Sequence, residues 1–206
     1  MTGKHCAARR SWAGAPGSTP LIFLETALRL HGLDPRSNVK LVTNITAPAR
    51  VGAWLAGQTQ YAIFSELDAA QLELDGQAQV VASIGQTVGM VDYTTFMATD
   101  RFLKDSASTV QAWTNAIARA MKWTGSAAEP DLAAALVPFF PGVSEQAMTA
   151  GIARYRRLRI WKTSPLIDPE SIVKFQDILM QGQALDAAKR VKFENLVVSE
   201  FARKAQ

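Results

Sequence analysis

The chain has 206 residues, of which 48% are hydrophobic and 19% are charged, and its formal net charge is +4. This length and composition predict a folded protein with a sizeable core and exclude a disordered chain. The single cysteine, Cys6, excludes an internal disulfide and a cysteine-based metal cluster, and the sequence contains no run of about 18 apolar residues that would predict a membrane span.

The first predicted element is a helix that follows a glycine-rich loop, in the stretch SWAGAPGSTPLIFLETALRLHG of residues 11–32. Gly14 and Gly17 permit a tight turn. Ser18 or Thr19 caps the helix, and Pro20 suits its first turn. Free N–H groups, the helix dipole and two hydroxyls then form a receptor for a sulfonate, carboxylate or phosphate. The pattern fits a plain helix cap equally well, and it matches neither a Walker loop nor G-x-G-x-x-G.

Short apolar runs then alternate with helical segments up to Asp100. The predicted strands cover residues 38–43, 60–65, 78–84 and 93–100, and the predicted helices between them cover residues 47–57 and 66–76. Strands separated by helices of this length indicate right-handed crossovers. The pattern therefore predicts an α/β fold whose parallel or mixed sheet is flanked by helices.

Beyond Asp100 the pattern predicts helices alone, at residues 108–125, 129–140, 144–161, 168–182 and 199–205. Ser108, Ser144 and Asp168 are of the residue types that cap helix starts. The change of pattern near residues 90–100 separates an α/β part, residues 13–92, from a helical part, residues 93–206.

No residue pattern indicates an enzyme. His5 and His31 are the only histidines, and neither stands in a metal-binding spacing or beside a G-x-S-x-G motif. We therefore expect no catalytic residue, no metal and no cofactor. The basic run at residues 154–159 favours a solvated helix face over a nucleic-acid surface, so no nucleic-acid partner is expected.

Four stretches, in this order, resemble type II periplasmic substrate-binding proteins: GAPGSTPLIFLETALRLHGLDPRSNVKLV, AWLAGQTQYAIFSELDAAQL, YTTFMATDRFLKDSASTVQAWTNAIARAMKW and IDPESIVKFQDILMQGQAL. The resemblance is to the branch that serves ABC importers of nitrate, sulfonates, taurine and thiamine-pyrimidine precursors. It implies a two-lobed clamp that closes about a hinge. Residues 13–92 would form most of the second lobe, and residues 93–206 would form the return crossing and the helical part of the first lobe.

The resemblance also implies where the ligand lies and what it is. The implied ligand-binding residues are Gly17, Ser18, Thr19, Phe64, Ser65, Glu66, Tyr93 and Thr94. The general rule that ligands bind outside the carboxyl ends of sheet strands points to the same edge. The implied ligand is a small anionic or zwitterionic organic compound, the implied partners are ABC permease subunits, and the implied location is the periplasm.

The sequence departs from this family at its start. Family members carry a secretion signal and half of the first lobe before the G-S-T loop, whereas here MTGKHCAARRSWA precedes it. We therefore expect a chain without the N-terminal part, cytoplasmic as written. Its helix 108–125 should expose an apolar face formed by Val110, Trp113, Ile117, Ala120 and Met121.

Two alternatives to solute capture stay open at this point. The chain could be a truncated relative that binds nothing and serves as an interaction module. An enzyme of the thiamine-pyrimidine synthase type is disfavoured, because those enzymes use a cysteine-rich iron-binding motif and this chain has one cysteine.

Overall fold

The computed structural model describes residues 10–46 and 49–205. The strands are β1 (Arg10–Trp12), β2 (Lys40–Val42) and β3 (Tyr61–Ala62). The helices are α1 (Thr19–Leu30), α2 (Arg50–Leu55), α3 (Glu66–Leu74), α4 (Ile84–Val88), α5 (Asp100–Asp105), α6 (Ala107–Ser126), α7 (Glu129–Leu136), α8 (Glu145–Arg157), α9 (Pro169–Gln181) and α10 (Glu200–Lys204). The described residues also include the 3-10 turns η3 (Val137–Phe139), η4 (Ala187–Lys189) and η5 (Phe193–Asn195).

The three described strands form one parallel sheet in the order β2-β1-β3. The strands predicted at 38–43 and 60–65 are confirmed as β2 and β3, although both are shorter than predicted. The sequence did not predict β1, because RSW is short and lacks apolar alternation. It is nevertheless the central strand, since main-chain bonds join its end to both neighbours: Ala13 donates to the carbonyl of Val42 at 3.0 Å, and Ile63 donates to that of Trp12 at 3.2 Å.

Helix α1 packs against other elements on two sides, and this packing fixes the position of its N-terminus at the edge of the sheet. One side, with Leu21, Leu24 and Leu28, packs on Ala13 and on the strand residues. The other side, with Ile22 and Ala27, packs on Val88 of α4 and Ile178 of α9. The buried residues of α1 are therefore those expected for an amphipathic helix with a wide apolar face.

The predicted helices after residue 100 are confirmed as α6, α7, α8, α9 and α10. Ser144 and Asp168 cap α8 and α9 as predicted, with their side chains accepting from the N–H groups of Ala147 and Glu170. Ser108 is not a cap, because α6 begins at Ala107 and Ser108 lies inside its first turn. Helix α7 ends at Leu136, four residues before the predicted end, where η3 with its proline begins.

Two predicted strands are wrong. Residues 78–84 do not pair with a strand. Ala78 donates to the carbonyl of Leu72 and Val80 donates to the carboxylate of Glu73, both in α3, and Ser83 and Ile84 begin α4. Residues 93–98 form no main-chain hydrogen bond within the described ranges. A β-strand exists only where a neighbouring strand exchanges such bonds with it.

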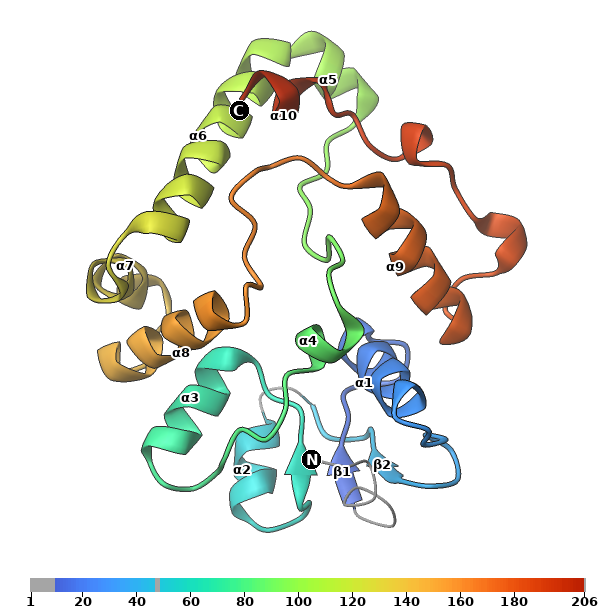
Figure 1. The fold of residues 1–206 in the computed structure, drawn as a ribbon, viewed down its shortest axis with the longest axis vertical. Coiled ribbons are helices and arrows are strands. Elements are labelled where there is room, and N and C mark those ends of the chain that lie inside the picture. Colours follow the sequence, from blue (N-terminus) through green and yellow to red (C-terminus); the bar gives the residue numbers. More distant parts are fainter. Residues whose placement is uncertain (1–9, 47–48, 206) are drawn as a thin grey trace.

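The elements are arranged so that the sheet, with α1, α2, α3 and α4, lies at one end of the molecule (Figure 1). Two segments run from this end through the middle. The first crossing segment, residues 89–99, leads from α4 to α5, and the second crossing segment, residues 158–168, leads from α8 to α9 (Figure 1). The first segment connects the sheet end with α5, and the second rises through the middle to the start of α9, which runs back towards α1 (Figure 1).

Candidate functional site

The turns after β1 and β3 lie at the same edge of the sheet, because the two strands are parallel and adjacent. Helix α1 begins after the first turn and α3 begins after the second, so the predicted residues at positions 17–19 and 64–66 share this edge. This is the edge at which open α/β sheets bind ligands.

The turn before α1 leaves polar groups without partners. Gly14 and Gly17 both have positive φ, +97° and +73°, which glycine adopts without strain. Ser18 occupies the cap position, but its side chain makes no capping bond, and its Oγ is buried with no hydrogen-bond partner in the described residues. The main-chain N–H groups of Thr19 and Leu21 also have no acceptor there. The head of α1 therefore holds unused donors.

The turn after β3 carries a charged cluster, which we call the Arg50 cluster: Trp12, Arg50, Phe64, Ser65 and Asp68. The Arg50 guanidinium forms an ion pair with Asp68 and lies 3.3 Å from the Ser65 Oγ. Ser65 in turn donates to Asp68 at 2.7 Å. The same guanidinium lies over the Trp12 ring at 5.4 Å and near the Phe64 ring at 5.8 Å, which are cation–π distances.

Of this cluster, the predicted ligand-binding residues include only Phe64 and Ser65. Arg50 and Asp68 look like ordinary helix-start charges in the sequence, and Trp12 belongs to the strand that was not predicted. The position of Arg50 could have indicated its place in the cluster, because Arg50 is the first residue of the helix after β2 and so lies at the same edge of the sheet. Its Nε is buried with no hydrogen-bond partner in the described part of the chain.

Glu66 does not join the Arg50 cluster. Its side chain, 12% exposed, lies between α3 and α8, where Oε1 is 3.2 Å from an Nη of Arg154. Arg154, 13% exposed, also pairs with Glu73. Burial raises the pKa of the Glu66 carboxyl, the nearby Arg154 charge opposes that rise, and Glu73 adds to it. Glu66 therefore joins two helices and is not directed at the head of α1.

The raised pKa of Glu66 predicts a pH-dependent stability. The folded state holds the Glu66 proton more tightly than the unfolded state, whose carboxyl titrates near the ordinary value of 4.5. The contribution of this group to stability is thus greatest below that pH and declines as pH rises towards the folded pKa. Tyr155 stays neutral throughout, because burial raises its pKa above 10.0.

Replacing Glu66 with glutamine should remove this decline. We expect the melting temperature of E66Q, relative to the unchanged chain, to be higher at about pH 8 than at about pH 4. Thermal denaturation followed by circular dichroism at both pH values measures the difference. The control is E145Q, at an exposed glutamate in the first turn of α8. A difference of the same size in E145Q would contradict the role given to burial.

The two predicted site residues of the first crossing segment, Tyr93 and Thr94, share no hydrogen bond or ring contact with the turns before α1 and α3. The Tyr93 ring packs against Phe23 of α1 at 5.7 Å and Phe175 of α9 at 6.5 Å. Thr94 is exposed. In the described residues, no hydrogen bond joins either of them to Ser18 or Ser65. Tyr93 instead links α1 to α9 at the base of the crossing.

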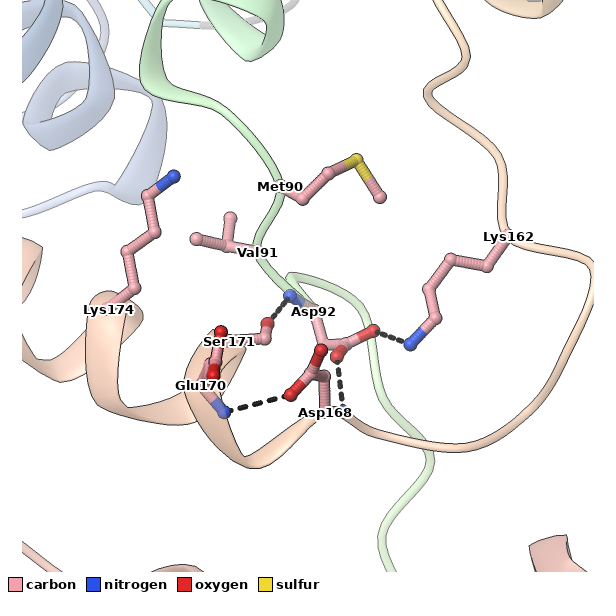
Figure 2. A pocket seen from close by; sticks show the side chains of 8 residues that line it. All are labelled: Met90, Val91, Asp92, Lys162, Asp168, Glu170, Ser171 and Lys174. Carbon is pink, nitrogen blue, oxygen red and sulfur yellow. Dashed lines mark hydrogen bonds and ion pairs between the residues drawn. The ribbon is translucent and has the colours of Figure 1, made fainter.

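A hollow of about 350 Å³ lies where the two crossing segments meet the start of α9. Its lining residues are Met90, Val91, Asp92, Lys162, Asp168, Glu170, Ser171 and Lys174 (Figure 2). Sequence analysis named none of them as site residues. Lys174 is directed away from Asp168 and Glu170, and its ammonium has no ion-pair partner among the described residues.

Asp92 joins the segments that line this hollow. Its Oδ1 accepts from the Lys162 ammonium at 2.7 Å, and its Oδ2 accepts from the Asp168 N–H at 3.1 Å. Its own N–H donates to the Ser171 hydroxyl at 2.5 Å. These dashed contacts in Figure 2 join both crossing segments to the first turn of α9. The hollow is thus a structural junction with charged walls.

Other site chemistries find no support in the described residues. No group of three or more His, Cys, Asp or Glu side chains there could hold a metal ion. No described helix is both long and apolar enough to cross a membrane. In the basic run, Arg154 and Arg156 form ion pairs with Glu66, Glu73 and Glu129.

Comparison with known proteins gives one similarity and one negative result. No protein-family model matches the chain. The chain is similar to a protein of Bacillus subtilis (strain 168) named "Putative binding protein YtlA", with 29% identity over 188 residues. The matched region covers 91% of this chain and 56% of the Bacillus protein, so this chain spans little more than half the length of that relative.

Proposed function

We propose that this chain belongs to the solute-binding component of an ABC importer and captures a small anionic or zwitterionic organic compound without catalysis. The observation that carries the proposal is the head of α1, where the buried Ser18 hydroxyl and two main-chain N–H groups lack partners in the described residues. Buried polar groups in folded proteins almost always have hydrogen-bond partners. A ligand with a sulfonate, carboxylate or similar group would supply them.

The adjoining Arg50 cluster would orient the rest of the ligand. Because Asp68 already balances the Arg50 charge, the negative group of the ligand would be held chiefly by neutral donors and by the dipole of α1. Ser65 and Asp68 together offer hydroxyl and carboxylate oxygens, which suit an ammonium group or a hydrogen-bonding ring on the same ligand. In this proposal Ser65 stays among the ligand-binding residues, where the resemblance placed it, and Asp68 takes the place of Glu66.

The transport setting belongs to the same proposal. The similarity to a protein named as a binding protein supports it, as does the resemblance of the sequence to importer-associated substrate-binding proteins. Ligand capture would draw the parts on either side of the two crossing segments together, and the closed form would dock on permease subunits at the periplasmic face of the membrane.

The test of capture begins with a defined panel of compounds: taurine, methanesulfonate, nitrate, acetate and an aminopyrimidine. A compound at about 100 times its dissociation constant stabilises the folded state by about 2.7 kcal/mol and so raises the melting temperature. We expect at least one compound with an anionic group to do so. If none of the five raises the melting temperature at millimolar concentration, capture of a small anion is rejected.

The site itself is tested by replacing Ser18 and Thr19 with alanine together. With taurine as the probe, we expect binding to weaken by about 1–3 kcal/mol in titration calorimetry, because hydrogen bonds to a charged group are lost. The matched control is S126A with T149A, whose hydroxyls bond to carbonyls of their own helices. Equal affinity in the two double variants would contradict the role of the α1 head.

A further inference from the structure

The hollow at the start of α9 contains two opposite charges that do not meet. Glu170 and Lys174 lie four residues apart on α9 with the glutamate first, which is the spacing and order that favour an ion pair on a helix. In the described residues, however, neither the Glu170 carboxylate nor the Lys174 ammonium forms a hydrogen bond or an ion pair. Both side chains line the hollow, and Lys174 extends away from Glu170 (Figure 2). The hollow therefore offers one free anion and one free cation.

Lys174 lies instead against the first crossing segment. A Cβ added at Gly89 would lie 2.6 Å from the Lys174 Nζ, so the ammonium is next to the main chain there. Gly89 ends α4 with a φ of +80°, a conformation that glycine adopts without strain. Within the described ranges, no carbonyl accepts a hydrogen bond from the Lys174 ammonium. The glycine thus makes room for an ammonium whose donors stay unused.

Further unused donors lie beside this ammonium. Ser171 and Lys174 are three residues apart on α9 and so are neighbours on its surface. Ser171 is 9% exposed, and its Oγ accepts from the Asp92 N–H, but its own proton has no acceptor among the described residues. The main-chain N–H groups of Met90 and Val91 have no acceptor there either. A carboxylate, which accepts several hydrogen bonds, would use these donors together with the ammonium.

The charges on the walls decide which ligand fits. Asp92 and Lys162 already form an ion pair. Asp168 caps the start of α9. A simple anion would pair with Lys174 but would also face the free carboxylate of Glu170, and a simple cation would leave Lys174 without a partner. A molecule that carries both charges satisfies both groups.

The size of the hollow limits the ligand to a short molecule. Its volume, about 350 Å³, is at the lower end of the range for small-molecule sites. Met90 and Val91 supply apolar walls for a short hydrocarbon chain between two charged groups. None of the lining residues belongs to the turn before α1, so a ligand here would not occupy the head of that helix.

We propose that this hollow is a binding site for a short zwitterionic amino-carboxylate. The carboxylate of the ligand binds the Lys174 ammonium and accepts from the Ser171 hydroxyl and the Val91 N–H. The ammonium of the ligand binds Glu170. The bound molecule thereby joins α9 to the first crossing segment, next to the hydrogen bonds that Asp92 makes. The proposal goes beyond solute capture at the head of α1 and stands whether or not that capture occurs.

The experiment titrates the full chain with β-alanine, propionate and propylamine in a calorimeter. The three probes are similar in size, but only β-alanine carries both charges at neutral pH. We expect β-alanine to bind at least tenfold more tightly than either singly charged probe. K174M and E170Q should each weaken β-alanine binding at least tenfold, because each removes one of the two charges that hold the ligand. In the bound chain, the Val91 amide hydrogen should exchange at least tenfold more slowly.

Controls separate this site from the fold and from the head of α1. K104M and E145Q remove exposed charges on α5 and α8 and should leave β-alanine binding unchanged. The double variant S18A with T19A should also bind β-alanine as the unchanged chain does. Circular dichroism checks that K174M and E170Q are folded before their affinities are compared. Should K174M fail to fold, E170Q and the exchange at Val91 decide the test.

Three outcomes would overturn the proposal. In the first, β-alanine binds no more tightly than propionate or propylamine. In the second, β-alanine binds, but K174M and E170Q keep the full affinity or Val91 is not protected. In the third, binding is lost in S18A with T19A and kept in K174M, which assigns the amino-carboxylate to the head of α1. Failure of taurine to bind at the head of α1 would leave these results unchanged, so the two proposals fail separately.

Discussion

Replacing Arg154 with methionine is expected to lower the free energy of unfolding by about 3–5 kcal/mol at neutral pH, because it leaves a buried carboxylate without its partner. Arg154 reaches from α8 to two glutamates of α3, Glu66 and Glu73. Its side chain and that of Glu66 are 13% and 12% exposed, so water replaces the lost charge poorly. Methionine keeps most of the apolar stem, which isolates the effect of the charge. Urea denaturation measures the change.

The pH dependence of this loss separates charge from packing. When Glu66 is protonated it no longer needs a cation, so the destabilisation by R154M should be smaller at about pH 4 than at about pH 8. The double variant R154M with E66Q should recover part of the stability at the higher pH. R119M is the matched control, since Arg119 is exposed on α6 and its replacement should change stability by about 0.5 kcal/mol at most. A loss in R154M that does not vary with pH would show that the stem, and not the charge, matters.

The Arg154 pair illustrates what the sequence could and could not predict. Glu66 was placed correctly at a helix start after a strand, because local pattern fixes that position. Its partner is 88 positions away in the chain, on a helix whose basic residues look like a solvated face. Local pattern says nothing about which face of α3 meets which face of α8. The α3–α8 contact is close at Gly151, because a Cβ there would lie 3.2 Å from the Glu66 Cγ, and the Glu66 side chain would have to shift by a few tenths of an ångström to make room for it.

The two wrong strands have a related cause. YTTFMATD has strong strand propensity, but propensity becomes a strand only where a partner is present. In the described residues no partner adjoins it, and the same lack of cover leaves the α6 face exposed. The opposite error occurred at β1, where three residues without apolar alternation form the central strand because neighbours lie on both sides. In each case the presence or absence of a neighbouring strand determined whether the segment formed a strand, and the local sequence pattern does not contain that information.

Asp92 is the second position at which one substitution should have a large effect. Replacing it with alanine removes two hydrogen bonds to its carboxylate, from the Lys162 ammonium and from the Asp168 N–H. Hydrogen bonds to charged groups contribute about 1.5–3 kcal/mol each, so we expect a loss of about 3–6 kcal/mol in the free energy of unfolding. The Asp92 side chain is 10% exposed, which limits compensation by water. Hydrogen exchange at Asp168 should also become faster, because its N–H loses its acceptor.

The control for D92A lies in the same hollow. Glu170 lines it, but in the described residues its carboxylate makes no hydrogen bond or ion pair, so E170Q should cost only the favourable charge at the start of α9, about 0.3–1 kcal/mol. A double-mutant cycle with D92N and K162M then measures the coupling across the two crossing segments. If D92A costs no more than E170Q, Asp92 does not hold the segments together. If the cycle gives a coupling near zero, the contacts of Asp92 with Asp168 and Ser171 hold the junction without the Lys162 ion pair.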